Sequence, residues 1–221
     1  MPRERGKHVP DSRKRPAEVF LNVPYDEPFE SLCLAYVSGI SAFGLVPRAT
    51  LEIREGTRRL DRILELIKAC RYSIHDLSRV ELDTKRPLTP RFNMPFELGL
   101  SVAWERISSK KHTWFVYEAR NRRLAKSLSD LNGTDPYVHG GTIRGVFREL
   151  CNAFVRTHRQ PTIQQMSKIY QDIARSLPVI LQEAGSNSIY NARVFKDVCL
   201  VASASASRNV PDQVGKKRIK V

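Results

Sequence analysis

The chain has 221 residues, of which 41% are hydrophobic and 8% aromatic, a composition typical of a globular protein that excludes fibrous and largely disordered classes. No apolar run approaches the roughly 20 residues that a membrane-spanning helix needs, and the basic start of the chain leads directly into a strand-like segment instead of the apolar stretch of a secretory signal. We therefore expect a cytoplasmic protein that does not enter a membrane. The four cysteines lie far apart and form no CxxC pair, so the sequence predicts neither a disulfide framework nor a metal site.

About half of the net charge of +14 lies at the two ends of the chain. Residues 1–18 carry six basic and three acidic side chains, and residues 207–221 carry five and one. We expect both segments to be basic, flexible tails. Their charge leaves open a weak, salt-sensitive attraction to nucleic acid.

Strand and helix patterns alternate from the first apolar segment onward. The nearly continuous apolar run at 19–23 predicts a strand that is buried on both faces. Apolar residues at helical spacing between Phe29 and Phe43 predict a helix that ends at Gly44. The next expected elements are a strand at 45–50, a helix around 60–67 and a strand at 72–77.

The second half continues this alternation after a polar loop at 78–91. The pattern predicts a helix from Met94 to Ile107 with Asn93 as its cap, and it then predicts strands at 113–117 and 136–139 and a closing helix that contains Val146, Leu150 and Phe154. Strands that alternate with helices of this length imply parallel pairing with right-handed crossovers. We therefore predict an α/β fold with a doubly wound parallel sheet of about five strands.

Four segments are expected along the chain. Residues 1–18 and 207–221 are the tails, residues 19–158 form the α/β domain, and residues 159–206 form a mostly helical extension. The helical pattern from Ile163 to Ala184 is followed by a stretch rich in Ser and Ala. Two roles remain open for this extension, which either continues the domain or mediates self-association into a homo-oligomer.

Polar side chains follow the first and third predicted strands and open the helix after the third. Ligands of open parallel sheets bind beyond the carboxyl ends of the strands, so these side chains are the candidate site. We expect Glu97 in the first turn of its helix, where the helix dipole favours a carboxylate, and Gly99 at a place where a backbone or ligand comes close. The candidate residues are Asn22, Tyr25, Asp26, Asp76, Ser78, Arg79, Asn93 and Glu97.

Three segments of the candidate site resemble a family of uncharacterised bacterial proteins. They are FLNVPYD at 20–26, CRYSIHDLSR at 70–79 and PRFNMPFELG at 90–99. More distantly, the Asp after the third strand and the Glu-Leu-Gly of the next helix are similar to nucleoside 2-deoxyribosyltransferases and TIR domains. The resemblance covers roughly residues 19–154, and it implies a flavodoxin-like, nucleotide-binding domain that cleaves N-glycosidic bonds.

The resemblance also implies a role for individual residues. Glu97 matches the carboxylate that acts on the anomeric carbon of the sugar, and Asp76 matches a position that holds ribose hydroxyls or protonates a leaving base. Tyr25 would stack on the base, while Asn22 and Asn93 would orient it through hydrogen bonds. Catalysis therefore requires Asp76 and Glu97 to face the same hollow.

NAD and ordinary nucleosides both remain open as substrates. Nicotinamide leaves NAD as a neutral molecule, so one carboxylate suffices, whereas nucleoside transfer needs a second one, such as Asp76 or Asp26, as a proton donor. No bound cofactor is expected, and NAD enters only as a substrate. For an enzyme of the TIR kind, the family expectation is a role in bacterial defence.

Two other function classes and a structural alternative stay open. The chain is either the enzyme described above, a module that binds a nucleotide signal without turnover, or a nucleic-acid-binding protein that uses its basic tails. The structural alternative is that Glu97 only caps its helix or pairs with Arg79 or Arg91, and that Asp76 only caps the turn after its strand.

Overall fold

The computed structural model describes residues 15–52, 58–79, 82, 86–109, 111–121, 126–131 and 133–211. Most of the two expected basic tails, residues 1–14 and 212–221, lies outside the described residues. Within the described part of the chain, no helix is both long and apolar enough to cross a membrane.

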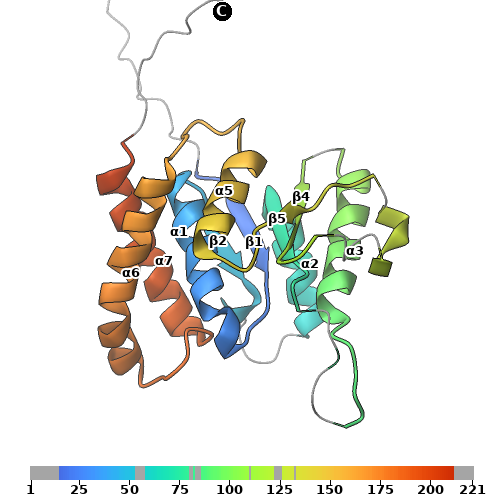
Figure 1. The fold of residues 1–221 in the computed structure, drawn as a ribbon, viewed down its shortest axis with the longest axis horizontal. Helices are drawn as coiled ribbons and strands as arrows, with labels where there is room; N and C mark the ends of the chain where they lie inside the picture. Colours follow the sequence, from blue (N-terminus) through green and yellow to red (C-terminus); the bar gives the residue numbers. More distant parts are fainter. Residues whose placement is uncertain are drawn as a thin grey trace, which may run out of the picture.

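A parallel sheet forms the centre of the fold (Figure 1). Its five strands run in the order β2-β1-β3-β4-β5, which is the order of flavodoxin-like folds. The predicted doubly wound α/β fold is therefore confirmed. The strands are β1 (Glu18–Asn22), β2 (Val46–Ala49), β3 (Tyr72–Asp76), β4 (Thr113–Glu118) and β5 (Tyr137–Val138).

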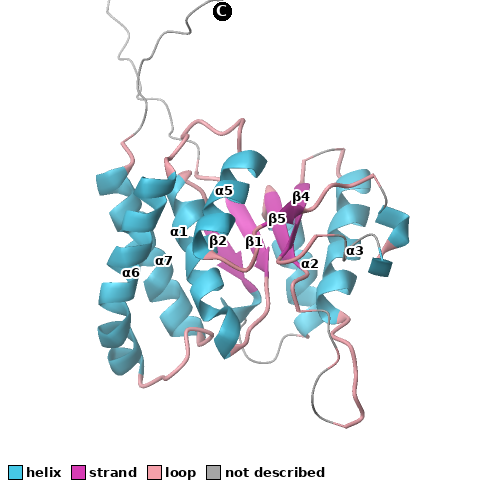
Figure 2. Ribbon diagram, viewed as in Figure 1, coloured by secondary structure: helices cyan, strands magenta, loops and turns pink. Residues whose placement is uncertain are grey.

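Helices enclose the sheet on both faces (Figure 2). Helices α1 (Glu30–Ala42) and α5 (Ile143–Ala153) pack together on one face, and α2 (Arg59–Ala69) and α3 (Asn93–Ile107) pack together on the other. Because side chains alternate along a strand, neighbouring residues of β1 enter different cores. Leu21 belongs to the core with α1 and α5, whereas Phe20 packs against α2.

The C-terminal extension forms two long helices, α6 (Ile163–Ala184) and α7 (Ala192–Asn209). They pack against each other and against α1, so their apolar side chains belong to the same core as α1 and α5. This outer layer explains why eleven of the thirteen residues of α1 are buried, on every side of the helix. The extension therefore continues the α/β core and is not a separate unit.

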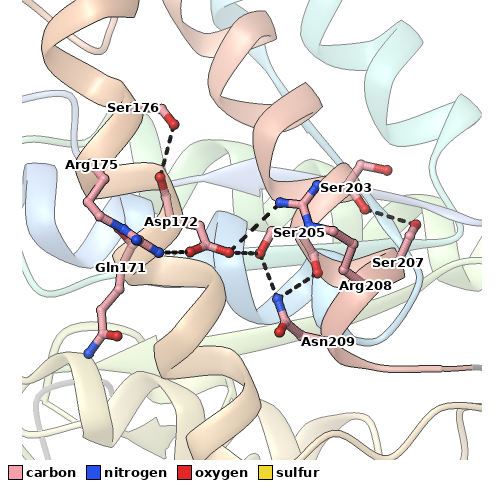
Figure 3. Close-up of polar contacts among 9 residues, drawn as sticks. All are labelled: Gln171, Asp172, Arg175, Ser176, Ser203, Ser205, Ser207, Arg208 and Asn209. Carbon is pink, nitrogen blue, oxygen red and sulfur yellow. Dashed lines mark hydrogen bonds and ion pairs between the residues drawn. The ribbon is translucent and has the colours of Figure 1, made fainter.

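The Ser/Ala-rich stretch is helical as far as Asn209. Alanine favours helix, and the small residues Ala202, Ser205 and Ala206 are buried where α7 meets its neighbours. One polar cluster also joins α7 to α6 (Figure 3): Ser205 Oγ donates to Asp172 Oδ2 at 2.5 Å. This hydrogen bond, followed by the pairing with Arg175, lowers the pKa of Asp172.

Candidate functional site

A cavity of about 330 Å³ lies at the carboxyl-terminal edge of the sheet. The loops after β1 and β2 meet the N-terminal ends of α2 and α3 there, in the position where open parallel sheets bind ligands. Four of the eight predicted site residues line it, namely Asn22, Tyr25, Asn93 and Glu97. The remaining lining residues are Val23, Thr50, Arg59, Arg91 and Met94.

Glu97 is the one acidic residue among the described residues that line this cavity. Helix α3 starts at Asn93, one residue before the predicted start, so Glu97 lies just beyond its first turn and Asn93 is not the cap. The Glu97 side chain is 4% exposed, and it makes no hydrogen bond or ion pair with any residue that the structure describes. Burial raises the pKa of this carboxyl group to about 7, and the charge of Arg59 only partly offsets the effect.

The alternative in which Glu97 pairs with Arg79 or Arg91 is wrong, because both arginines pair with Asp26. Arg91 Nη1 lies 2.9 Å from Asp26 Oδ2, and Arg79 Nη2 lies 3.5 Å from Asp26 Oδ1. These ion pairs tie the loop after β1 to the segments around α3 and after β3. Arg91 lines the cavity and also pairs with Asp26. Asp26 and Arg79 do not line the cavity, although Asp26 follows a lining residue, Tyr25.

The expectation that Asp76 faces the same hollow as Glu97 is wrong. Asp76 is fully buried, and it is not among the residues that line the cavity. Its Oδ2 accepts a hydrogen bond from Tyr36 Oη at 2.8 Å and lies 3.1 Å from His139 Nε2, while its Oδ1 accepts from the backbone N–H of Ser78 at 2.9 Å. Asp76 therefore joins β3 to α1 and to the end of β5.

The direction of Asp76 follows from the alternation of side chains along β3. His75 lies edge-on to Phe20, on the α2 face of the sheet, so the next residue must point to the α1 face. The cavity lies on the α2 and α3 side, beside Arg59 and Glu97. Ser78, another predicted site residue, is buried and bonds through its hydroxyl group to His139 Nε2 at 3.2 Å, away from the cavity.

Tyr25 enters the cavity from the loop after β1 and is held on two sides. Its hydroxyl group lies 3.1 Å from Thr50 Oγ1, and its ring packs against Tyr190 with ring centroids 5.2 Å apart. Burial raises the pKa of the Tyr25 phenol well above its ordinary value, so this hydroxyl group stays protonated at neutral pH.

Sequence patterns missed Arg59 and Tyr190. Arg59 is the first residue of α2, and amphipathic spacing shows which side of a helix is apolar but not what lies beyond its end. The sequence signal that could have indicated Arg59 is its position at the start of a helix, where open parallel sheets bind ligands. Tyr190 carries no such signal, since it comes from the loop between α6 and α7.

A Cβ atom at Gly99 would meet no protein atom within 4 Å, so the expected close approach of another backbone segment is wrong. The described residues contain no group of three His, Cys, Asp or Glu side chains that could hold a metal ion.

Comparison with protein-family models, with curated proteins and with solved structures finds no match to this chain.

Proposed function

We propose that the Glu97 cavity binds a nucleotide whose ring carries a positive charge, as in NAD, and cleaves the N-glycosidic bond of that nucleotide. The observation that carries this proposal is the state of Glu97, a buried carboxyl group without a partner among the described residues, in a cavity where loops of the sheet edge converge. A buried, unpaired carboxyl group costs stability, and such groups are typical of functional sites.

The charges around the cavity suit such a ligand. Arg59 and Arg91 are exposed lining residues, whereas Glu97 is nearly fully buried. A ligand with a cationic ring at its inner end and phosphate groups at its outer end matches this arrangement, because each charge meets its opposite.

The reaction needs a single carboxylate. When the bond between C1′ and the ring nitrogen breaks, its electron pair stays on the nitrogen, the neutral base leaves, and positive charge develops on the sugar. The Glu97 carboxylate would stabilise this charge. Water forms the new C1′–O bond, and Glu97, whose pKa is raised to about 7 mainly by burial, is suited to accept the proton that water loses.

This chemistry favours NAD over ordinary nucleosides. An ordinary nucleobase usually needs a proton from a second acidic group as it leaves. Asp76 bonds to Tyr36 and Asp26 pairs with arginines, so neither carboxylate shares the cavity with Glu97. The proposed substrate is therefore the one whose leaving group departs without a proton.

Mass spectrometry of the products formed from NAD tests the proposal. We expect the wild-type protein to release nicotinamide at a rate that rises with pH through about 7, where Glu97 ionises. Glu97→Gln should lower the rate on the order of 100-fold. Glu65→Gln is the matched control, because Glu65 is an exposed residue of α2 that pairs with Arg62 away from the cavity.

Two results would contradict the proposal. One is a Glu97→Gln variant that releases nicotinamide as fast as the wild type. The other is binding of NAD without any turnover by the wild type, which would instead support a nucleotide-binding module.

A further inference from the structure

A chain of buried hydrogen bonds runs from the cavity into the interior of the sheet. Asn22 Nδ2 lies 2.8 Å from His75 Nδ1, and His75 Nε2 lies 2.9 Å from Ser73 Oγ. Ser73 Oγ lies 2.9 Å from His112 Nε2, and His112 Nδ1 lies 2.9 Å from the carbonyl oxygen of Cys70. Each of the four side chains is at most 5% exposed, so solvent does not compete for these bonds.

The carbonyl oxygen at the far end of this hydrogen-bond network fixes the direction of every hydrogen bond in it. The Cys70 carbonyl oxygen can only accept, so His112 Nδ1 carries the proton and His112 Nε2 accepts from the Ser73 hydroxyl group. Ser73 Oγ then accepts from His75 Nε2, which leaves His75 Nδ1 as an acceptor for the Asn22 amide. Burial lowers the pKa of His75 to about 3 and also lowers that of His112, so both rings are neutral at physiological pH.

The orientation of the Asn22 amide follows from this order. One Nδ2 hydrogen goes to His75, and the other goes to the carbonyl oxygen of Met94 at 3.2 Å. A flipped amide would set its oxygen against two acceptors, which is unfavourable in a buried place. Oδ1 is left without a hydrogen-bond partner among the described residues, in a side chain that lines the cavity.

We propose that this hydrogen-bond network presents Asn22 Oδ1 to the cavity as an acceptor, and that the cavity therefore selects a ligand that donates a hydrogen bond to Asn22. Together with the proposed function, on which the choice of ligand rests, this inference names the carboxamide form of a pyridine nucleotide as the substrate and excludes the carboxylate form. A carboxamide offers N–H donors to Asn22 Oδ1, whereas a carboxylate offers only acceptors. His75 and Ser73 are positioning residues that act through Asn22.

Histidine tautomers, measured by ¹⁵N–¹H NMR on ligand-free protein, test the orientation of Asn22. We expect the Nε2–H tautomer for His75 and the Nδ1–H tautomer for His112, with assignment by comparison with His75→Gln and His112→Gln. A His75 ring that is protonated at Nδ1 would overturn the inference, because the Asn22 amide would then have to flip. This readout does not depend on any ligand.

Selectivity is tested with NAD and nicotinic acid adenine dinucleotide, which differ in the carboxamide and carboxylate groups. Both affinities are to be measured by calorimetry with the Glu97→Gln variant. This substitution prevents turnover and removes the repulsion between Glu97 and the ligand carboxylate. The carboxamide form should bind on the order of tenfold more tightly or better, because the carboxylate leaves Asn22 Oδ1 unsatisfied.

Ser73→Ala, added to this background, should lower the preference several-fold. Ser73 does not line the cavity, and its loss frees His75 to change tautomer. Ser38→Ala is the matched control, since Ser38 is another fully buried serine and bonds only within α1, to the Leu34 carbonyl oxygen. Two results would overturn the inference. One is that Glu97→Gln binds the two dinucleotides equally tightly, and the other is that adding Ser73→Ala leaves the preference for NAD unchanged. Failure of both to bind would contradict the proposed function, and the tautomer spectrum would still decide how Asn22 is oriented.

Discussion

Tyr25 and Tyr190 pack ring against ring, with centroids 5.2 Å apart and ring planes 37° from parallel, although 165 positions separate them in the chain. The Tyr190 hydroxyl group donates to the carbonyl oxygen of Asp26 at 3.0 Å, so the same residue holds the backbone beside Tyr25. The loop between α6 and α7 therefore supports the loop after β1, which supplies one wall of the cavity.

Substitution of Tyr190 should weaken this wall. Tyr190→Ala removes the ring and should cost about 2 kcal/mol of unfolding free energy and lower the affinity for NAD, because Tyr25 loses its neighbour. Tyr190→Phe keeps the ring, loses only one hydrogen bond, and should cost about 1 kcal/mol with little effect on affinity. Urea unfolding and calorimetry measure both quantities. Equal affinities of Tyr190→Ala and the wild type would show that Tyr190 does not shape the site.

Glu97 should make the protein less stable as the pH rises. Because burial raises the pKa of Glu97 from 4.5 to about 7, the folded state binds a proton between these values that the unfolded state has released. The proton therefore adds up to about 3 kcal/mol to the free energy of unfolding. This stabilisation is fully present below pH 4.5 and is lost as the pH rises through about 7. Glu97→Gln should therefore exceed the wild type in stability at pH 8, and by less at pH 5. Urea unfolding at the two pH values measures this, and parallel curves for the two proteins would refute it.

Arg59 and Arg91 should contribute to binding only when the ligand carries phosphate. Arg59→Ala and Arg91→Ala should each weaken NAD binding about fivefold at low salt, an effect of about 1 kcal/mol, and leave nicotinamide riboside binding nearly unchanged. High salt should reduce the loss, because the two side chains are exposed. Arg62→Ala is the control, since Arg62 pairs with Glu65 outside the cavity. Equal losses for both ligands would argue against phosphate contacts.

Asp76 should matter for stability and not through the cavity. Tyr36 and the backbone of Ser78 both donate hydrogen bonds to Asp76, so the N–H group of Asp76→Asn would face other donors. This variant should lose about 2–4 kcal/mol of unfolding free energy. Thermal unfolding followed by circular dichroism measures the loss. Asp61→Asn, at an exposed position of α2, should leave the Tm nearly unchanged. A variant as stable as the wild type would contradict the structural role of Asp76.

Two glycines should respond in opposite ways to alanine. A Cβ atom on Gly145 would lie 1.8 Å from the carbonyl oxygen of His139, so Gly145→Ala should cost about 3 kcal/mol or more. Gly99 lies inside helix α3 with nothing within 4 Å of such an atom, so Gly99→Ala should add about 0.5–1 kcal/mol through helix propensity. Urea unfolding of both variants decides, and a destabilised Gly99→Ala would show a constraint that the structure lacks.

Local patterns in the sequence were sufficient to predict the sheet, most of its helices and four of the nine described residues that line the cavity. Apolar runs and helical spacing depend on which side of each element is buried, and these signals lie within a few residues of one another. Asn22 and Tyr25 were predicted to be in the site because they lie at and just after the carboxyl end of β1, and Glu97 because it lies near the start of α3. Parallel topology alone brings such positions to one edge.

Tertiary packing decided which polar groups meet. Asp76 and Glu97 were both expected at this edge, yet the alternation along β3 turns Asp76 toward α1 and away from the cavity. Tyr190 reaches the site only because α6 and α7 pack on α1. The sequence by itself determined the order and the faces of the elements, since those depend on neighbouring residues. The partners of each buried polar group depend on residues far along the chain, and only the folded structure brings these together.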